Sequence, residues 1–255
     1  CGARRCAGGT VTAINYGKLT AIALDPIEKK PLNAFHPGSN ILSVGSFGCN
    51  LDCPFCQNAA IASAREGDLP VQKVSPDALA DLALDLKPRG NIGVAFTYNE
   101  PLIGWEYVID SARAVHARGL LTVAVTNGSV NPEISGRILP HLDALNIDLK
   151  AFTADHYRRP GGDLYTVKTF ITRAVHTGCH VELTTLIVPG FNDSAKEISA
   201  LASWVAGVNP AIPLHITRFF PAHRMGRSAP TPVAKIFDLA AVARRYLPTV
   251  YEGNV

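Results

Sequence analysis

The sequence predicts an α/β fold: a partial (β/α)6 TIM-like barrel with an N-terminal β-hairpin extension. Short apolar runs alternate with helix-length segments, about six times, and two of the runs become polar on one face toward their C-terminal ends. Such alternation is typical of a parallel sheet with right-handed crossovers. The chain has 255 residues, 47% of them hydrophobic, which is enough for one such fold.

The expected elements follow one another in a regular order. Residues 9–24 are predicted to form a β-hairpin with its turn at Tyr16-Gly17, followed by a Pro-rich loop. The later strand-length runs are 41–46, 91–97, 120–126, 142–150, 180–188 and 213–220. The helix-length segments between and after them are 75–87, 101–118, 131–140, 163–177, 193–207 and 230–246. We therefore predict two parts, an N-terminal hairpin and loop over 1–40 and the partial barrel over 41–255.

The composition excludes several classes of function. A net charge of +3 gives no general reason to expect a nucleic acid or a membrane as partner. No apolar run approaches the roughly 18 residues that span a bilayer, and the front end has no apolar signal segment. We expect a cytoplasmic protein with reduced thiols. The chain lacks an initiating Met, since its single Met is Met225, so we expect that it is truncated at the front.

Strand faces favour a partial barrel over a doubly wound sheet. A sheet covered by helices on both sides should be apolar on both faces. The runs 142–150 and 180–188 instead carry polar residues on one face, as expected where a barrel interior holds a ligand. These polar residues are Asn146, Asp148 and Lys150 in the first run and His180, Glu182 and Thr184 in the second.

The strongest motif is "GCNLDCPFCQN", residues 48–58, where Cys49, Cys53 and Cys56 have the spacing C-x₃-C-x₂-C. The loop follows the first expected barrel strand, at the end of the barrel where active sites lie. A ferredoxin-type cluster takes four thiolates. Three thiolates on a four-iron cluster would leave one iron open to bind a substrate or cofactor.

Zinc is the alternative metal. A structural zinc site takes four tetrahedral ligands. The fourth would have to come from His36, Cys1 or Cys6, none of which has a recognisable zinc-finger spacing. Cys179 begins an apolar run, and we expect it to be an inert buried thiol.

The cysteine spacing, with Phe55 before the last cysteine, resembles the cluster motif of radical S-adenosylmethionine (SAM) enzymes. The resemblance extends over nearly the whole chain from about residue 40. It implies a [4Fe–4S] cluster whose open iron chelates the amino and carboxylate groups of SAM. An electron from the cluster then breaks the C5′–S bond, giving methionine and a 5′-deoxyadenosyl radical that abstracts hydrogen from a substrate.

Further segments resemble activating enzymes of the pyruvate formate-lyase type. "TYNEP", residues 97–101, matches their Gly-Gly-Glu-Pro motif, with Tyr98 and Asn99 in place of the glycines. By this resemblance Glu100 holds the SAM amino group, and a carboxylate is a suitable acceptor for an ammonium. The alternative for Glu100 is an acidic residue at a helix N-terminus before Pro101.

"VTNGSV", residues 125–130, is similar to the family's Asp-Thr-Asn-Gly segment, with Val125 in place of the Asp that helps to bind a monovalent cation. "DLK", "VPGFND" and "HITRFFPAHRMG" resemble three further cofactor segments. The alternatives are a strand-to-helix turn for "VTNGSV", a structural ion pair for "DLK", a plain turn for "VPGFND" and polar surface for "HITRFFPAHRMG". The resemblance implies these cofactor-binding residues: Phe55, Asn99, Glu100, Thr126, Asn127, Asp148, Lys150, Val188 and His223.

The front end resembles a narrower subgroup, the radical SAM enzymes of the AmmeMemoRadiSam system. The segments "DPIEKKPL", "PGS", "CQN", "TYNEP" and "DLKAF" carry this resemblance. Cys1 and Arg4 resemble the end of an upstream cysteine-rich segment, which implies a second metal site in front of this chain. The subgroup's genes accompany Memo-like and AMMECR1-like proteins, which are therefore the implied partners.

The substrate is the least determined part of the prediction. His180, Glu182, Thr184 and Arg218 are the candidates to hold it, and the alternative is that they form a hydrogen-bonded, partly wet barrel interior. Arg218, His223, Arg224 and Arg227 also form a basic patch, which is either a docking site for an acidic electron donor such as flavodoxin or ferredoxin or an ordinary solvated rim. Two alternatives to the radical enzyme with an unidentified substrate stay open: an activating enzyme of a glycyl-radical partner, and an electron-transfer iron–sulfur protein without SAM chemistry.

Overall fold

The computed structural model describes residues 2–255, so Cys1 and its predicted role lie outside the described residues. The chain divides into two compact units, which are described separately. Unit 1 comprises Cys1–Asn50, Asn58–Thr126 and Asn131–Leu145, and unit 2 comprises Leu51–Gln57, Asn127–Val130 and Asn146–Val255. The boundary predicted between residues 40 and 41 does not coincide with this division.

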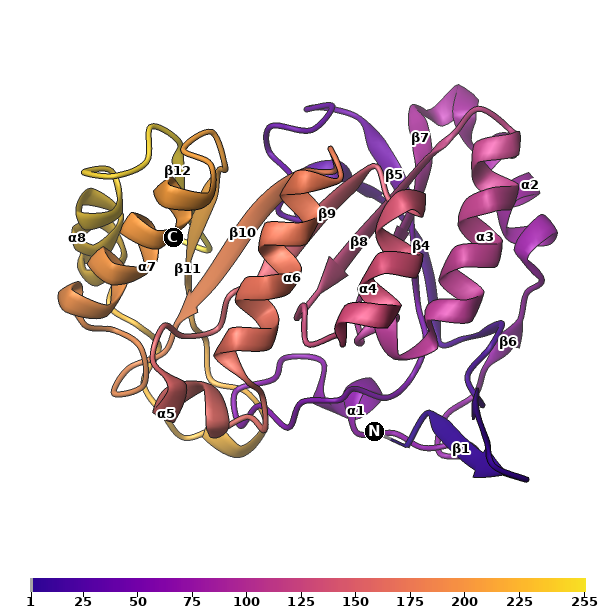
Figure 1. Cartoon of the computed structure of the whole chain (residues 1–255), viewed down its shortest axis with the longest axis horizontal. Coiled ribbons are helices and arrows are strands. Elements are labelled where there is room, and N and C mark those ends of the chain that lie inside the picture. Colours follow the sequence, from indigo (N-terminus) through magenta and orange to yellow (C-terminus); the bar gives the residue numbers. More distant parts are fainter. Residues whose placement is uncertain (1) are drawn as a thin grey trace. The chain divides into compact units, whose positions relative to one another are not determined.

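Unit 1 contains four neighbouring strands of a sheet in the order β4, β5, β7, β8 (Figure 1). Strands β5, β7 and β8 are parallel, and β4 runs antiparallel to β5. Its strands are β1 (Arg4–Ala7), β2 (Thr10–Ala13), β3 (Lys18–Leu19), β4 (Ala21–Pro26), β5 (Asn40–Gly45), β6 (Gln72–Lys73), β7 (Asn91–Phe96) and β8 (Leu121–Thr126). Its helices are η1 (Ile27–Lys29), α1 (Ala59–Ala62), α2 (Pro76–Asp85), η2 (Lys87–Arg89), η3 (Pro101–Gly104), α3 (Trp105–Ala117), α4 (Pro132–Ile138) and η4 (Leu139–His141).

Unit 2 contains the strand order β9, β10, β11, β12, and β10, β11 and β12 are parallel. The strands are β9 (Ala144–Asp148), whose first two residues belong to unit 1, β10 (His180–Ile187), β11 (Leu214–Arg218) and β12 (Val250–Gly253). The helices are α5 (Ala154–Arg158), α6 (Leu164–His176), α7 (Ala195–Val208), η5 (His223–Met225) and α8 (Val233–Ala243). Helix α6 packs against β10, and α8 packs against β11 and β12 (Figure 1).

The predicted fold class is confirmed. Each expected strand and helix after residue 40 is present, and the alternation is that of a partial TIM-like barrel. Among the described strands, β4 and β12 have one neighbour each, so the sheet is not closed. Several helices begin at or next to their predicted first residue, and there a side chain accepts a backbone N–H of the first turn, which stabilises the helix start. The caps of α2, α4, α6 and α7 are Ser75, Asn131, Asp163 and Ser194.

The N-terminal hairpin is present, but its predicted position is wrong. Its strands are β1 and β2, joined at Gly8-Gly9, whereas we expected 9–24 with a turn at Tyr16-Gly17. The second half of the expected hairpin is β4, which takes its partner from β5. Alternating apolar residues show that a strand exists, but they do not show which strand pairs with it.

The Pro-rich loop is part of the core of unit 1. Ile27 and Leu32 are fully buried and pack against Ile41, Ala95 and Val123 of three neighbouring strands. On the helical side, α2 and α3 lie side by side against β7 and β8 (Figure 1). The unit-1 sheet is therefore covered on both faces. No helix within residues 2–255 is both long enough and apolar enough to cross a membrane.

We predict that Gly93→Ala will strongly destabilise the fold. Gly93 lies in β7, where a Cβ atom would sit 2.6 Å from the carbonyl carbon and 2.7 Å from the nitrogen of Leu121 in β8. Backbone atoms of a paired strand cannot move aside cheaply, so we expect the free energy of unfolding to fall by about 3 kcal/mol or more. Chemical denaturation measures this.

Gly207→Ala is the matched control. Gly207 lies in α7 and has no atom within 4 Å of its added Cβ. Alanine is the better helix former, so this change should stabilise the protein by about 0.5–1 kcal/mol. Equal stability of the two variants would contradict the packing of β7 against β8.

Candidate functional site

Glu100 lies at the end of β7 in unit 1. Its carboxylate is 3% exposed. The Oε1 atom accepts hydrogen bonds from the Leu102 N–H at 3.0 Å and from the Thr126 hydroxyl at 2.7 Å. Glu100 therefore caps the 3₁₀ helix η3, which agrees with the alternative interpretation of Glu100 as an acidic residue at a helix N-terminus. It also contacts Thr126, another of the predicted cofactor residues. One carboxylate brings the ends of β7 and β8 together.

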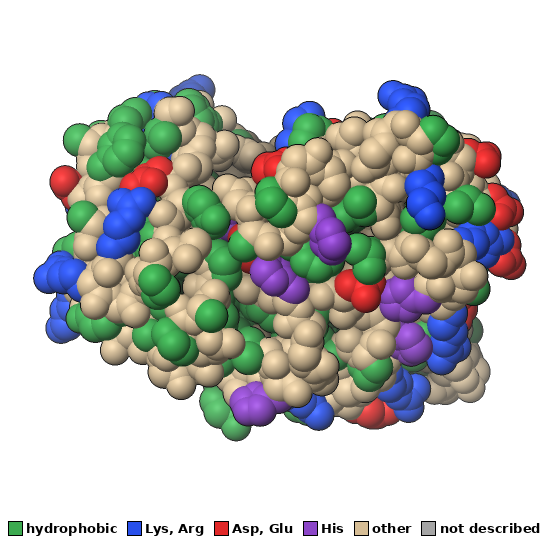
Figure 2. Space-filling view, turned by 90° about the horizontal axis from the view of Figure 1, so that it is seen from above, with side chains coloured by type: hydrophobic (Ala, Val, Ile, Leu, Met, Phe, Trp, Pro, Cys, Tyr) green, Lys and Arg blue, Asp and Glu red, His purple; other side chains and the backbone are tan. Residues whose placement is uncertain are grey.

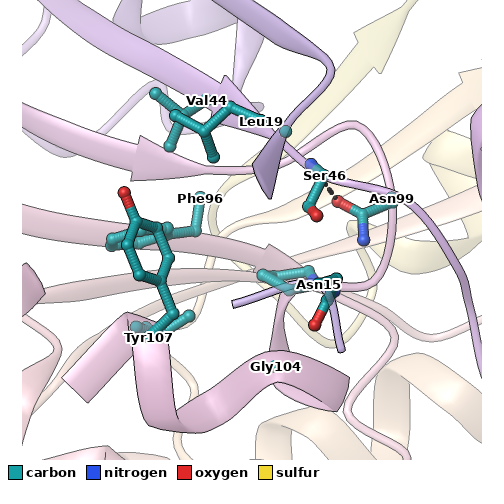
Figure 3. Close-up of a pocket in the computed structure, with 11 residues that line it drawn as sticks. Asn15, Leu19, Val44, Ser46, Phe96, Asn99, Gly104 and Tyr107 are labelled. Atoms are coloured by element: carbon teal, nitrogen blue, oxygen red, sulfur yellow. Dashed lines mark hydrogen bonds between the residues drawn. The ribbon is translucent and has the colours of Figure 1, made fainter. Parts of the chain in front are cut away.

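The Asn99 side chain contacts the segment that leads to Cys49. Its Oδ1 accepts the N–H of Ser46 at 3.0 Å, and its Nδ2 donates to the carbonyl groups of Phe47 at 3.3 Å and Gly48 at 3.0 Å. Figure 3 shows this side chain turned toward Ser46, beside a small pocket of unit 1. The Asn99 amide thus holds the start of the cysteine loop, and the cofactor role expected for Asn99 stays a prediction.

Asn127 follows β8 and belongs to unit 2. Its Oδ1 accepts the N–H of Ser129 at 2.8 Å, which makes it the first residue of a turn. The turn needs glycine at position 128, because φ is +65° and a Cβ would lie 3.0 Å from Ile147 Cγ2. The structure thus contains the turn that was the alternative to a cofactor role for Asn127.

Cys53 and Cys56 belong to one turn of unit 2, in which the Cys56 N–H donates to the Cys53 carbonyl at 3.2 Å. Burial raises the pKa of the Cys53 thiol, and the nearby Lys150 ammonium opposes this rise. Cys49 is half-buried and belongs to unit 1. Within residues 2–255, no three His, Cys, Asp or Glu side chains converge on a point that could hold a single metal ion.

Lys150 and Asp148 form an ion pair after β9, with 2.9 Å between Nζ and Oδ2. Their side chains are 17% and 35% exposed. Burial acts to lower the pKa of Lys150, but the charges of Asp148 and Cys53 hold it above its usual value. Lys150 therefore carries a proton at neutral pH, and its charge acts on a cysteine of the predicted cluster motif.

These donors fit an iron–sulfur cluster. Three thiols occur within eight residues of one loop, and the positive charge of Lys150 opposes the rise that burial causes in the pKa of the Cys53 thiol. In a cluster each thiolate binds a different iron, so the three sulfur atoms need not converge on one point.

Asn192, in the loop after β10, is a residue that the sequence motifs did not single out. Val188 is fully buried, and its N–H donates to Asn192 Oδ1 at 2.8 Å. Asn192 Nδ2 donates to the carbonyl groups of Lys150 and Leu186, both at 2.8 Å. The side chain of Val188 is thus enclosed by protein, and Asn192 ties the loop to Lys150. The Asn in "VPGFND" was the available signal, since buried turns often carry such an amide.

The predicted basic patch is partly neutralised. Arg224 in η5 forms an ion pair with Asp52 at 2.9 Å and donates to the Asp52 carbonyl at 2.6 Å. Arg218 Nε donates to the Thr231 carbonyl at 2.7 Å. His223 is exposed and has a positive φ of +48°. Arg224 therefore holds the cysteine loop of unit 2, and Arg218 is partly used within the fold.

His180 and Glu182 lie at the beginning of β10, and the substrate role expected for them stays a prediction. Glu182 is fully buried, and its oxygens lie 3.0 Å from His180 Nε2 and 2.7 Å from His215 Nε2. These residues occupy the beginnings of β10 and β11, about 20 Å along the strand from Val188. Figure 2 looks onto the end of the molecule where these strands begin, and histidine side chains reach its surface.

Thr184 and Arg218 lie farther along these strands than Glu182. The Thr184 hydroxyl is buried and has no hydrogen-bond partner among the described residues, and Arg218 ends β11. These two residues therefore stay candidates for a substrate contact.

The comparisons with known proteins agree with the motif. The sequence model of the Radical SAM superfamily matches residues 43–203, more than half of the chain. An uncharacterized protein of Methanocaldococcus jannaschii is 33% identical over 259 residues, covering 100% of this chain and 76% of that protein. The 4-hydroxyphenylacetate decarboxylase activating enzyme of Clostridioides difficile is 26% identical over 153 residues, covering 59% of this chain and 47% of the enzyme.

A solved structure has a similar fold. Streptococcus suis SuiB bound to S-adenosylmethionine superposes with a TM-score of 0.66 at 13% identity, covering 84% of this chain and 52% of SuiB. The fold, the cysteine loop and the family match lead to one conclusion: the chain belongs to the radical SAM superfamily. It is a radical SAM oxidoreductase that uses a [4Fe–4S] cluster and SAM.

We predict that Glu182 stabilises unit 2. Glu182→Gln removes the charge between two histidines and should lower the free energy of unfolding by about 2–3 kcal/mol. SAM affinity should not change. Denaturation and calorimetry measure the two quantities. Glu133→Gln, which removes a carboxylate from an exposed ion pair with Arg137, is the control and should hardly alter stability. An unchanged stability of Glu182→Gln would contradict the structural role.

Proposed function

We propose that Cys49, Cys53 and Cys56 hold the cluster, Glu100 binds the amino group of SAM, and Lys150 binds its carboxylate. The observation that carries this proposal is the half-buried Lys150 at the end of β9, an ammonium held 2.9 Å from Asp148 whose charge also acts on the Cys53 thiol. The carboxylate of SAM chelates the same cluster in the family. An ammonium whose charge acts on a cluster ligand is therefore well placed to receive it.

Each of the other residues has a proposed task that its contacts support. Thr126 donates to Glu100 and so fixes the direction of its carboxylate. Asp148 balances the charge of Lys150. Phe55 is 4% exposed and packs against Phe191, with 5.4 Å between ring centroids, which keeps water from the loop. When bound, the reduced cluster and SAM supply a 5′-deoxyadenosyl radical that abstracts a hydrogen atom from the substrate.

For the remaining cofactor residues, backbone contacts are the proposed mode. Val188 is buried and the Asn127 Oδ1 belongs to a turn, so main-chain groups of these residues are the atoms proposed to face the adenosyl part. The imidazole of His223 is exposed and can reach a bound cofactor from η5. On the substrate side we propose Thr184 and Arg218, which suits a substrate with an anionic or hydrogen-bonding group.

A second candidate is activation of a glycyl-radical partner protein. The similarity to the 4-hydroxyphenylacetate decarboxylase activating enzyme favours it. Val125, in place of the cation-binding Asp of the activating enzymes, favours a different substrate. We further propose membership of the AmmeMemoRadiSam subgroup, supported by its sequence segments, with Memo-like and AMMECR1-like partners and a flavodoxin or ferredoxin as electron donor.

The deciding experiment is anaerobic reconstitution with iron and sulfide, followed by SAM and a reductant. The proposed function requires 5′-deoxyadenosine among the products. Deuterium transfer from a candidate substrate into that product then identifies the substrate. An iron–sulfur protein that is reduced but forms no 5′-deoxyadenosine would be an electron carrier instead.

We predict that Cys49→Ala, Cys53→Ala and Cys56→Ala will each abolish the cluster, because three thiolates are the fewest that hold a four-iron cluster with one open iron. Iron and sulfide analysis and the visible absorption of the cluster measure the loss. Cys179→Ala is the control, since Cys179 lies at the start of β10 and contacts the His180 carbonyl at 3.6 Å. Loss of the cluster in the Cys179 variant, or its retention in any of the three, would contradict the assignment.

We predict that Glu100→Gln and Lys150→Met will keep the iron but weaken SAM binding. Each removes one charge-assisted hydrogen bond, worth about 1.5–3 kcal/mol, so the Kd should rise by roughly 10- to 150-fold. Anaerobic calorimetry on the reconstituted protein measures it. Glu106→Gln is the control, because Glu106 pairs with Arg4 at 2.6 Å elsewhere in unit 1. If both variants bind SAM as the parent protein does, the cofactor placement is wrong.

A further inference from the structure

Tyr98 has a strained backbone. Its φ is +72°, a region that bulky residues rarely adopt. The Asn99 N–H donates to the Thr97 carbonyl at 3.0 Å, so Tyr98 is the centre of a three-residue turn with positive φ, a rare and strained kind. Such a conformation persists only where the surrounding structure enforces it, and strain of this kind concentrates at functional sites.

A buried ion pair holds the Tyr98 side chain. The Tyr98 hydroxyl donates to Asp25 Oδ2 at 2.8 Å, and Lys30 Nζ lies 2.9 Å from the same oxygen. Lys30 also lies 4.8 Å from the centroid of the Tyr98 ring. Asp25 and Lys30 are 8% and 3% exposed. Burial and the Asp25 carboxylate raise the pKa of Tyr98 to about 12, so its hydroxyl stays a donor at neutral pH.

The sheet beneath Tyr98 is matched to this ring. Gly45 ends β5, and a Cβ there would lie 2.8 Å from Tyr98 Cδ2 and 3.0 Å from Tyr98 Cβ. Glycine at 45 therefore makes the room that a tyrosine at 98 requires. A residue that only filled space would not need a charged anchor as well. Buried ion pairs contribute little net stability, and holding one conformation is a better-supported use for them.

Three consecutive residues are thus anchored to three different parts of unit 1. Tyr98 is tied to Asp25 of β4, Asn99 to the segment before Cys49, and Glu100 to Thr126 of β8. The first of these anchors has no contact with any group already assigned to the cofactor. Its effect reaches the cofactor only through the backbone of the turn.

We propose that Tyr98 is a positioning residue, which Asp25 and Lys30 pin in place so that the turn at 97–99 presents the Glu100 carboxylate to SAM in a fixed direction. The inference rests on the proposed role of Glu100. A group that is already ordered before binding loses less conformational entropy when the ligand arrives. Removing the anchor should therefore weaken SAM binding without slowing the reaction of bound SAM.

The test uses Tyr98→Phe and Tyr98→Gly in the reconstituted protein. Phenylalanine keeps the ring and loses the bond to Asp25, while glycine relieves the positive φ and loses the whole anchor. We expect both to keep their iron and to raise the Kd for SAM about tenfold, the order expected for freeing one or two residues. The rate of 5′-deoxyadenosine formation at saturating SAM should stay within about twofold of the parent rate. This is about the deviation expected for a substitution that does not interact with the reacting groups.

Tyr16→Phe is the matched control. It removes a tyrosine–aspartate hydrogen bond of the same length, 2.8 Å to Asp110, elsewhere in unit 1. This variant should bind SAM like the parent protein. If Tyr98→Phe fails to assemble a cluster, Tyr98→Gly decides, because glycine adopts the positive φ without strain.

The double variant Tyr98→Phe/Glu100→Gln separates this inference from the proposed function. Because Tyr98 acts through Glu100, the double variant should bind SAM no more weakly than Glu100→Gln alone. Fully additive losses, or parent-like binding by Tyr98→Gly while Glu100→Gln is impaired, would overturn the inference alone. Parent-like binding by Glu100→Gln would instead overturn the proposed role of Glu100.

Discussion

The hydrogen bonds of one half-buried amide, that of Asn99, constrain the site in unit 1. Asn99 bonds the backbone of residues 46–48, and the Glu100 N–H lies 3.4 Å from the same Gly48 carbonyl that Asn99 contacts. A half-buried amide that lost these partners would cost free energy, so the bonds of Asn99 favour a fixed arrangement of the two segments. The start of the cysteine loop and the residue proposed to bind the SAM amino group therefore share one support.

The two ends of the unit-2 strands have different tasks. Where β9 and β10 end, the charge of Lys150 acts on Cys53, and Asn192 ties the following loop to Lys150. Where β10 and β11 begin, Glu182 lies enclosed between two histidines. This division agrees with the general pattern of α/β barrels, in which chemistry occupies the C-terminal ends of the strands and stability the N-terminal ends.

Tyr98 and Asn99 stand where similar activating enzymes carry glycine, and the structure explains how larger residues are accommodated. The Asn99 amide bonds the backbone before Cys49. Tyr98 adopts a strained φ because Asp25 and Lys30 hold its side chain and Gly45 leaves space for its ring. A flexible glycine pair is thus replaced by a rigid, anchored turn. The compensation is spread over residues far apart in the chain, which is why the motif alone did not reveal it.

The sequence by itself determined the order of strands and helices and the cysteine motif, and it indicated Glu100 and Lys150 as candidate cofactor residues. These features are local: apolar periodicity, capping residues such as Ser75, and short motifs with fixed spacing. Only the tertiary structure decided that β4 pairs with β5, that Glu182 lies between two histidines, and that Asn99 faces the cysteine loop. Tyr98 and Asp25 are 73 residues apart, and no local pattern encodes such a contact, because it arises only when the whole sheet brings distant side chains onto one face.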